Sequence, residues 1–324
     1  MKPLVLITGG AGFIGSHLTR ELLGRGLRVS VLDDLSTGEA RNMDPHRHNP
    51  DFTFHAGSFT QEDLLAELVD RADHVVHLAA AVGVMLIVED PVRTIETNIL
   101  GTELVLRNAR KKLKPVVIAS TSEVYGKGAS IPFREDDDVV LGPTSKSRWS
   151  YAASKMVDEF MGLAYHKQHA LPVRIVRFFN TVGPGQVGRY GMVIPRLVAQ
   201  ALQGEALTVY GDGAQQRCFA DVSDVVRGVA DMMACPAAVG QVYNLGNDRE
   251  ISIMELAQRV NALTGNKAGI VKVPYEKAYG EGFEDMRRRV PDLTKARTAF
   301  GYQPKVDTDS ILRRVIEHMK GAQV

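Results

Sequence analysis

The chain has 324 residues, of which 44% are hydrophobic and 24% charged, and its 39 basic and 38 acidic side chains leave a net charge of +1. This composition excludes a disordered chain, and the length allows one large α/β domain or two lobes. No stretch concentrates Lys and Arg as a nucleic-acid-binding surface does, and the longest apolar run, Leu78 to Val88, is shorter than the ~20 residues that span a bilayer. The two cysteines lack metal-ligand spacing, and the N-terminus enters an apolar run without a signal peptide. We therefore expect a cytoplasmic protein with no metal site, no nucleic-acid partner and no membrane partner.

Short apolar runs alternate with amphipathic helical patterns through the first half of the chain. The runs predict strands at residues 4–8, 28–33, 74–78, 115–119 and 173–178, and the helical patterns lie at 14–25, 61–70, 93–111 and 149–169. Short continuous apolar runs are typical of strands that are buried on both faces of a parallel sheet. The alternation therefore predicts an α/β protein with a Rossmann-type doubly wound parallel sheet.

The pattern changes after residue 178. Gly and Pro cluster at 180–185 and again at 210–213, with only short elements between them. A helix at 221–233 and a strand at 241–245 are expected to return to the main sheet, and two more helices are expected at 253–264 and 307–320. We predict a dinucleotide-binding domain of residues 1–178 plus 219–246, and a smaller C-terminal α/β substrate-binding lobe of residues 179–218 plus 247–324.

The glycines Gly9, Gly12 and Gly15 follow the first predicted strand and open a helix. Glycines in this context allow a tight turn and a close approach to a pyrophosphate, which binds the free N–H groups of the helix N-terminus. Asp33 follows about 20 residues later, at the end of the next strand, where an acid accepts hydrogen bonds from the adenosine ribose and repels a 2′-phosphate. The pattern predicts NAD rather than NADP as cofactor.

Tyr151 and Lys155 lie one helical turn apart on one face of a predicted helix. A nearby ammonium and an oxidised nicotinamide both lower the pKa of a phenol, which lets it act as a general base. Thr121 lies just past the carboxyl end of a predicted strand, where its hydroxyl can share a hydrogen bond with the reacting oxygen. These three residues are the predicted catalytic set.

Together with the glycine motif, the segments Phe178-Phe179-Asn180 and Leu207–Gly213 resemble those of extended short-chain dehydrogenase/reductases. More narrowly, the chain is similar over nearly its whole length to the NAD-dependent sugar-nucleotide epimerase/dehydratase family. The resemblance implies bound NAD, a UDP-sugar substrate and a homodimer that packs through the helices at 93–111 and 149–169.

The resemblance also assigns residues by their position in the family's motifs. It places at the cofactor Gly9, Gly12, Phe13, Ile14, Gly15, Asp33, Leu78, Ala79, Asn98, Tyr151 and Lys155. It places at the substrate Thr121, Ser122, Glu123, Asn180, Arg189, Val193, Thr208, Tyr210, Arg217 and Arg289. In this set Thr208 and Tyr210 flank the nucleotide base and Arg217 meets the pyrophosphate. One departure is Ser58, where the family usually has an aspartate that reads the adenine amino group.

Several residues discriminate between the family's reactions, which share a 4-keto sugar intermediate. Dehydratases have Asp-Glu after the catalytic threonine, whereas this chain has Ser122-Glu123, and a hydroxyl cannot replace a carboxylic acid as proton donor. The Thr-Ser-Glu triplet resembles UDP-glucuronate decarboxylases, whose β-keto acid intermediate loses CO2. Tyr-Ala-Ala-Ser-Lys, however, replaces the Tyr-Asp-Glu-Gly-Lys of those enzymes, and residues 183–192 look epimerase-like.

A carboxylate on the substrate calls for an arginine, whose two parallel donors match it. Arg189 is one candidate, and the cluster Arg287-Arg288-Arg289 supplies others, although the cluster is better explained by pyrophosphate binding. We rank UDP-glucuronate 4-epimerase first, UDP-glucose 4-epimerase second and UDP-glucuronate decarboxylase (UDP-xylose synthase) third. A catalytically silent NAD-binding scaffold is disfavoured because Tyr151 and Lys155 are both present.

Overall fold

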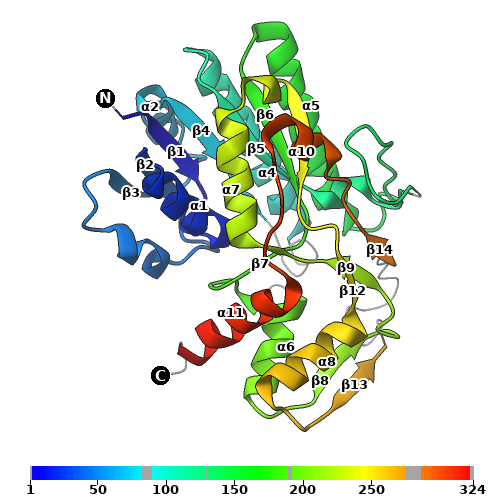
Figure 1. Ribbon diagram of the computed structural model, residues 1–324. Coiled ribbons are helices and arrows are strands. Elements are labelled where there is room, and N and C mark those ends of the chain that lie inside the picture. The colour runs from blue at the N-terminus through cyan, green and yellow to red at the C-terminus, as the bar shows by residue number, and fades with distance from the viewer. Residues whose placement is uncertain (1, 82–89, 129, 189–191, 275–285, 322–324) are drawn as a thin grey trace.

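A parallel sheet forms the centre of the computed structural model, which describes residues 2–81, 90–128, 130–188, 192–274 and 286–321 (Figure 1). In the described part the sheet has seven strands in the order β3-β2-β1-β4-β5-β6-β11. The strands are β1 (Leu4–Thr8), β2 (Arg28–Asp33), β3 (Phe52–Ala56), β4 (His74–His77), β5 (Val116–Thr121), β6 (Val173–Phe178) and β11 (Gln241–Leu245). This order reverses direction between β1 and β4, which confirms the predicted Rossmann-type doubly wound sheet.

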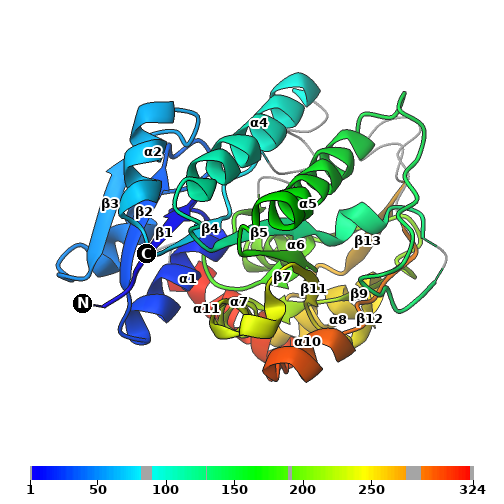
Figure 2. The same cartoon turned by 90° about the horizontal axis from the view of Figure 1, so that it is seen from above.

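Helices cover both faces of this sheet (Figure 2). One face carries α1 (Phe13–Gly24), α7 (Val222–Ala234) and α10 (Thr294–Phe300). The other face carries α2 (Glu62–Arg71), α4 (Pro91–Arg110) and α5 (Trp149–His169). Because the central strands are covered on both sides, their side chains are almost all buried, which explains the continuous apolar runs in the sequence.

A second group of elements lies beyond the carboxyl edge of the sheet, at the bottom of Figure 1. Its helices are α6 (Val193–Leu202), α8 (Ile253–Thr264) and α11 (Thr308–Gly321). Its short strands pair as β8 (Leu207–Tyr210) with β13 (Ile270–Val273), β7 (Thr181–Val182) with β10 (Ala220–Asp221), and β9 (Gln216–Cys218) with both β12 (Glu250–Ser252) and β14 (Arg288–Arg289). The three helices share one apolar core with β8, separate from the cores that flank the main sheet.

Three elements differ from expectation or were not expected. β3 was missed because it is an edge strand whose side chains are only half-buried, so its sequence lacks a continuous apolar run. α6 was missed in a region that the Gly and Pro clusters had suggested was mostly loop. α10, within the predicted C-terminal lobe, packs against β11 and α7, where Leu293 and Ala296 join the core of the main sheet. The shorter 3-10 helices are η1 (Ala40–His46), η2 (Ser122–Tyr125) and η4 (Pro236–Ala238).

Candidate active site

A cavity of about 780 Å³ lies at the carboxyl ends of the parallel strands, between the main sheet and the second group of elements. It extends from the β1–α1 turn, past the ends of β4 and β5, to the strand β14. This is the crevice where doubly wound sheets bind their ligands, because the helices on either side of the switch point diverge there.

The glycines of the β1–α1 turn allow its backbone to pack closely where a side chain would clash with it. Gly9 has a φ of +73°, and a Cβ atom on it would lie 2.7 Å from the backbone nitrogen of Ala79. A Cβ atom on Gly15 would lie 2.3 Å from the carbonyl oxygen of Gly9. Gly12 precedes α1 without a side-chain cap, so the first N–H groups of the helix face the cavity. The turn therefore fits the pyrophosphate of a dinucleotide.

Asp33 stands at the far side of this turn and is buried. Its carboxylate accepts hydrogen bonds from the backbone N–H groups of Ala11, at 2.9 Å, and of Leu35, at 2.8 Å. Burial raises the pKa of Asp33, and these two hydrogen bonds oppose the rise. A carboxylate has further lone pairs, so Asp33 can still accept the predicted hydrogen bond from the adenosine ribose. Ser58 also lines the cavity and bonds the hydroxyl of Thr60.

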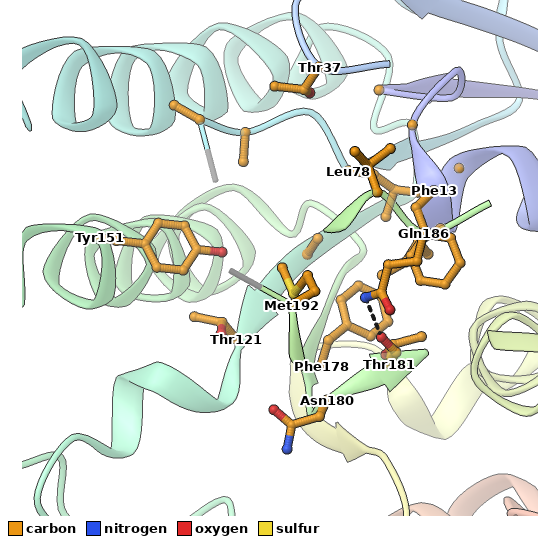
Figure 3. A pocket seen from close by; sticks show the side chains of 18 of the residues that line it. Phe13, Thr37, Leu78, Thr121, Tyr151, Phe178, Asn180, Thr181, Gln186 and Met192 are labelled. Carbon is orange, nitrogen blue, oxygen red and sulfur yellow. Dashed lines mark hydrogen bonds between the residues drawn. The ribbon is translucent and has the colours of Figure 1, made fainter. Parts of the chain in front are cut away.

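Tyr151 and Thr121 meet across the cavity from α5 and β5 (Figure 3). The Thr121 side chain acts to lower the pKa of Tyr151. The backbone N–H of Glu123 donates to the Thr121 oxygen at 3.2 Å, which fixes the orientation of that hydroxyl. Burial raises the pKa of Tyr151, and the charge of Glu123 raises it further. The sequence had predicted a lowered pKa, and the structure differs because burial of the phenol raises the pKa, as do the charges of Glu123 and Asp158. The ammonium of Lys155 is paired with the carboxylate of Asp158 at 2.7 Å.

Glu123 lies between two arginines at the substrate end of the cavity. Arg289 Nη1 is 2.6 Å from Glu123 Oε1, and Arg148 Nη2 is 3.2 Å from Oε2. Burial alone would raise the pKa of Glu123, but the charges of Arg289 and Arg148 outweigh it and hold the pKa below its ordinary value. The Nε atom of Arg289 is buried and has no hydrogen-bond acceptor among the described residues. The site thus combines one carboxylate with two guanidinium groups.

Most of the residues predicted for the site do line the cavity. Those that line it are Gly9, Gly12, Phe13, Ile14, Gly15, Asp33, Leu78, Ala79, Thr121, Ser122, Glu123, Tyr151, Lys155, Asn180, Val193, Tyr210, Arg217 and Arg289. The exceptions are Asn98, which bonds Ala81 and Ser154 inside the protein, and Thr208, whose hydroxyl is held by Arg196 and Gln200. Arg189 lies outside the described residues.

The arginine cluster separates because β14 is extended and its side chains alternate. Arg289 turns into the cavity, while its neighbour Arg288 is exposed and pairs with Glu250. Arg287 is also exposed.

Sequence reasoning missed two other arginines. Arg148 comes three residues before Tyr151, a helical spacing that could have suggested a shared face. Arg196 lies 3.9 Å from the ring centre of Tyr210, and only the folded chain brings them together.

Some features are absent from the part of the chain that the structure describes. There, no three His, Cys, Asp or Glu side chains gather as metal ligands. None of the helices in these same ranges combines the length and the apolar character needed to cross a membrane.

A glycine-rich turn at the switch point and a Tyr-Lys-Thr set facing it define the class of NAD-dependent extended short-chain dehydrogenase/reductases. Residues 6–315 match the sequence model of the GDP-mannose 4,6 dehydratase family. The chain belongs to this family of NAD-dependent enzymes that modify sugar nucleotides.

Three relatives locate the chain within the family. A UDP-N-acetyl-alpha-D-glucosaminuronate decarboxylase from Bacillus cytotoxicus is 45% identical over 98% of both chains. A UDP-glucuronic acid decarboxylase from Danio rerio is 37% identical over 98% of this chain and 72% of its own length. The structure of a UDP-glucuronic acid 4-epimerase from Bacillus cereus, in complex with UDP-glucuronic acid and NAD, aligns with a TM-score of 0.88 at 28% identity, over 98% of this chain and 99% of the other.

These identities show that the first-ranked reaction, 4-epimerisation of UDP-glucuronate, is wrong. The two sequence relatives are uronate decarboxylases, whereas the epimerase is similar mainly in fold. The residues between Tyr151 and Lys155 misled the prediction. Ala152 and Ser154 are buried and do not line the cavity, so they affect how α5 packs rather than the chemistry.

Proposed function

We propose that the protein is an NAD-dependent decarboxylase of a UDP-linked glucuronic acid, either UDP-glucuronate or its 2-acetamido analogue. The observation that carries the proposal is the state of the acid groups beside Tyr151. Ser122 has no carboxyl group, and Glu123 is held ionised between Arg289 and Arg148. Neither residue can protonate a departing hydroxide, as dehydration requires, whereas CO2 leaves without a proton.

The chain's own residues supply the remaining steps. Tyr151, aligned by Thr121, takes the proton of the sugar 4-hydroxyl. Bound NAD supplies the hydride acceptor at this carbon. The product is a β-keto acid, so the bond between C5 and the carboxylate breaks and its electrons move to the C4 oxygen. The hydroxyls of Tyr151 and Thr121 then stabilise the enolate at this oxygen, and a proton from solvent returns to C5. Return of the hydride to C4, with the proton held by Tyr151 going back to the C4 oxygen, would give the pentose and leave the cofactor oxidised.

The substrate carboxylate needs a cation that is fixed before binding. Arg289 is buried, and its Nε has no acceptor among the described residues, so it can bond a second carboxylate without leaving Glu123. Arg148 lies on the opposite side of Glu123 and keeps this residue charged when Arg289 is shared. This arrangement supports binding of an acidic sugar more than of a neutral one.

The test is to incubate the purified protein with NAD and each of UDP-glucuronate, UDP-N-acetylglucosaminuronate and UDP-glucose. We expect release of CO2 and a UDP-pentose from one or both uronates, identified by mass spectrometry and NMR. The ratio of kcat/KM for the two uronates identifies which substituent at C2 is preferred. No CO2 from either uronate would overturn the proposal.

We also propose that the protein is a homodimer that packs through α4 and α5. The two helices lie side by side on one face of the sheet (Figure 2). Their outer surface exposes Val92 (62%) and Leu100 (58%) on α4 and Phe160 (65%) on α5. Large apolar side chains gathered on one surface are typical of a subunit interface.

A further inference from the structure

A buried carboxylate, Asp158, has no part in the proposed reaction. It follows Lys155 by three residues on α5, so both side chains lie on the inner face of the helix. The side chains of Asp158 and Lys155 are 0% and 3% exposed, and Asp158 Oδ2 is 2.7 Å from Lys155 Nζ. The second oxygen, Oδ1, is buried and has no hydrogen-bond partner among the described residues. Thr102 of α4 faces the same carboxylate.

The charges of the other groups around Lys155 and Tyr151 are already balanced or absent. Glu123 faces Tyr151 from η2, but it is paired with Arg289 of β14 and with Arg148, which precedes α5. Glu159, the next residue on α5, is paired with Arg177 of β6 at 2.7 Å.

His77 of β4 faces Lys155, and burial lowers its pKa to about 3, so it is neutral at physiological pH. Among the described residues, Asp158 is therefore the partner that offsets the ammonium of Lys155.

We propose that Asp158 is a positioning residue that holds the ammonium of Lys155 and offsets the charge that Lys155 presents to Tyr151. The inference rests on Tyr151 being the proton acceptor of the proposed function. Lys155 has three donor hydrogens, of which Asp158 occupies one, and the others remain for the phenol and the cofactor ribose.

The physical consequence can be measured. Lys155 lies one helical turn from Tyr151 on α5, and both line the cavity. Without the carboxylate the charge of Lys155 would act on Tyr151 more strongly, and a nearby opposite charge favours the ionised phenol by about one to three pH units. Asp158→Asn removes the charge with little change of shape. Asp158→Ala is the second variant, because it leaves space for water to solvate Lys155 if the amide variant does not fold.

The experiment is a phenolate absorbance titration of the full chain, over the pH range in which circular dichroism shows it folded. The Tyr151 signal is the difference between each protein and its Tyr151→Phe counterpart at equal NAD content. We expect phenolate to appear at least about one pH unit lower in Asp158→Asn, or in Asp158→Ala, than in the wild type. Asp158→Glu, which keeps the charge, should restore the wild-type curve.

Asp231→Asn is the matched control, because it makes the same change in an exposed ion pair, with Arg25, far from the cavity. It should leave the Tyr151 curve unmoved. Curves for the Asp158 variants that coincide with the wild type would overturn the inference, since a merely structural carboxylate would change stability alone. The titration needs no substrate, so its outcome is independent of whether the protein decarboxylates a uronate.

Discussion

At the scale of residues, the site is governed by charges that neutralise one another. Glu123 pairs with Arg289 and Arg148, and Lys155 pairs with Asp158. Buried charges of this kind are costly unless they are paired, so each pair fixes the position of its members. Tyr151 lies among these pairs, and its burial together with the charge of Glu123 raises its pKa.

Tyr151→Phe tests the proton acceptor. The change removes the hydroxyl and keeps the ring, so folding and NAD binding should survive. A general base contributes about 10²–10⁴ in rate, and kcat on the preferred UDP-uronate should fall by at least that factor. Turnover close to that of the wild type would remove Tyr151 from this role.

Arg289→Met tests the site of the substrate carboxylate, and Arg288→Met is its matched control. A charge-assisted hydrogen bond contributes about 1.5–3 kcal/mol, so kcat/KM for the UDP-uronate should fall by about 10–100-fold. The affinity for UDP-glucose, which has no carboxylate, should change far less. Arg288 is exposed and pairs with Glu250, and its replacement should leave both measurements unchanged. Equal losses for the acidic and the neutral ligand would argue against a carboxylate contact.

At the scale of elements, the carboxyl ends of the strands decide where chemistry occurs. β1 ends at the glycine turn, β5 ends at Thr121, and the cavity lies above both. The inner face of α5 then brings Tyr151 opposite Thr121 (Figure 3). Because the carboxyl ends of parallel strands all lie at one edge of the sheet, residues from five or more elements meet in one place.

Gly15→Ala and Gly24→Ala form a matched pair on α1. A methyl group at Gly15 would clash with the Gly9 carbonyl, so the β1–α1 turn must shift. We expect the NAD content of the purified protein to fall by at least tenfold. Gly24 has no atom within 4 Å of its added Cβ, and its replacement should leave NAD content unchanged and stability equal or slightly higher. Cofactor content and melting temperature measure the two effects. Retained NAD in Gly15→Ala would contradict the binding of the pyrophosphate at the β1–α1 turn.

At the scale of the whole molecule, two groups of elements enclose one cavity, and the outer side of α4 and α5 exposes apolar side chains. The cavity is lined from both the main sheet and the elements beyond its carboxyl edge. The exposed apolar side chains of α4 and α5 lie on the outer side of these helices, where the proposed second subunit would cover them.

Phe160→Asp tests the proposed dimer. A charge at this exposed position should not affect folding of the single chain, but it would be buried without a partner in the interface. We expect the mass measured by light scattering to fall from that of a dimer to that of a monomer. Lys167→Asp, at a polar position near the end of α5, serves as the control for added charge. A wild-type monomer would contradict the proposal directly.

The cofactor should be recycled within each turnover. If the hydride taken from C4 is returned to the same sugar, catalytic amounts of NAD suffice and NADH does not accumulate. Absorbance of NADH and quantification of the UDP-pentose, followed in one reaction, give the ratio of the two. NADH formed in equal amount with product would show a net oxidation instead.

The sequence by itself determined the fold class, the position of most central strands and helices, and the cofactor. Strand and helix periods are local, and glycine, Asp33 and the Tyr151–Lys155 spacing act within single turns or helices. The residues that decide which reaction occurs, in contrast, interact with residues far away in the sequence. Only the tertiary structure decided that Glu123 is ionised, since its partners lie 25 and 166 residues away in Arg148 and Arg289. It also decided that Lys155 pairs with Asp158. Tyr151 and Asp158 both lie within one helical turn of Lys155, so the sequence allows either as its partner. Burial strengthens the ion pair with Asp158 because water no longer competes for the two charges.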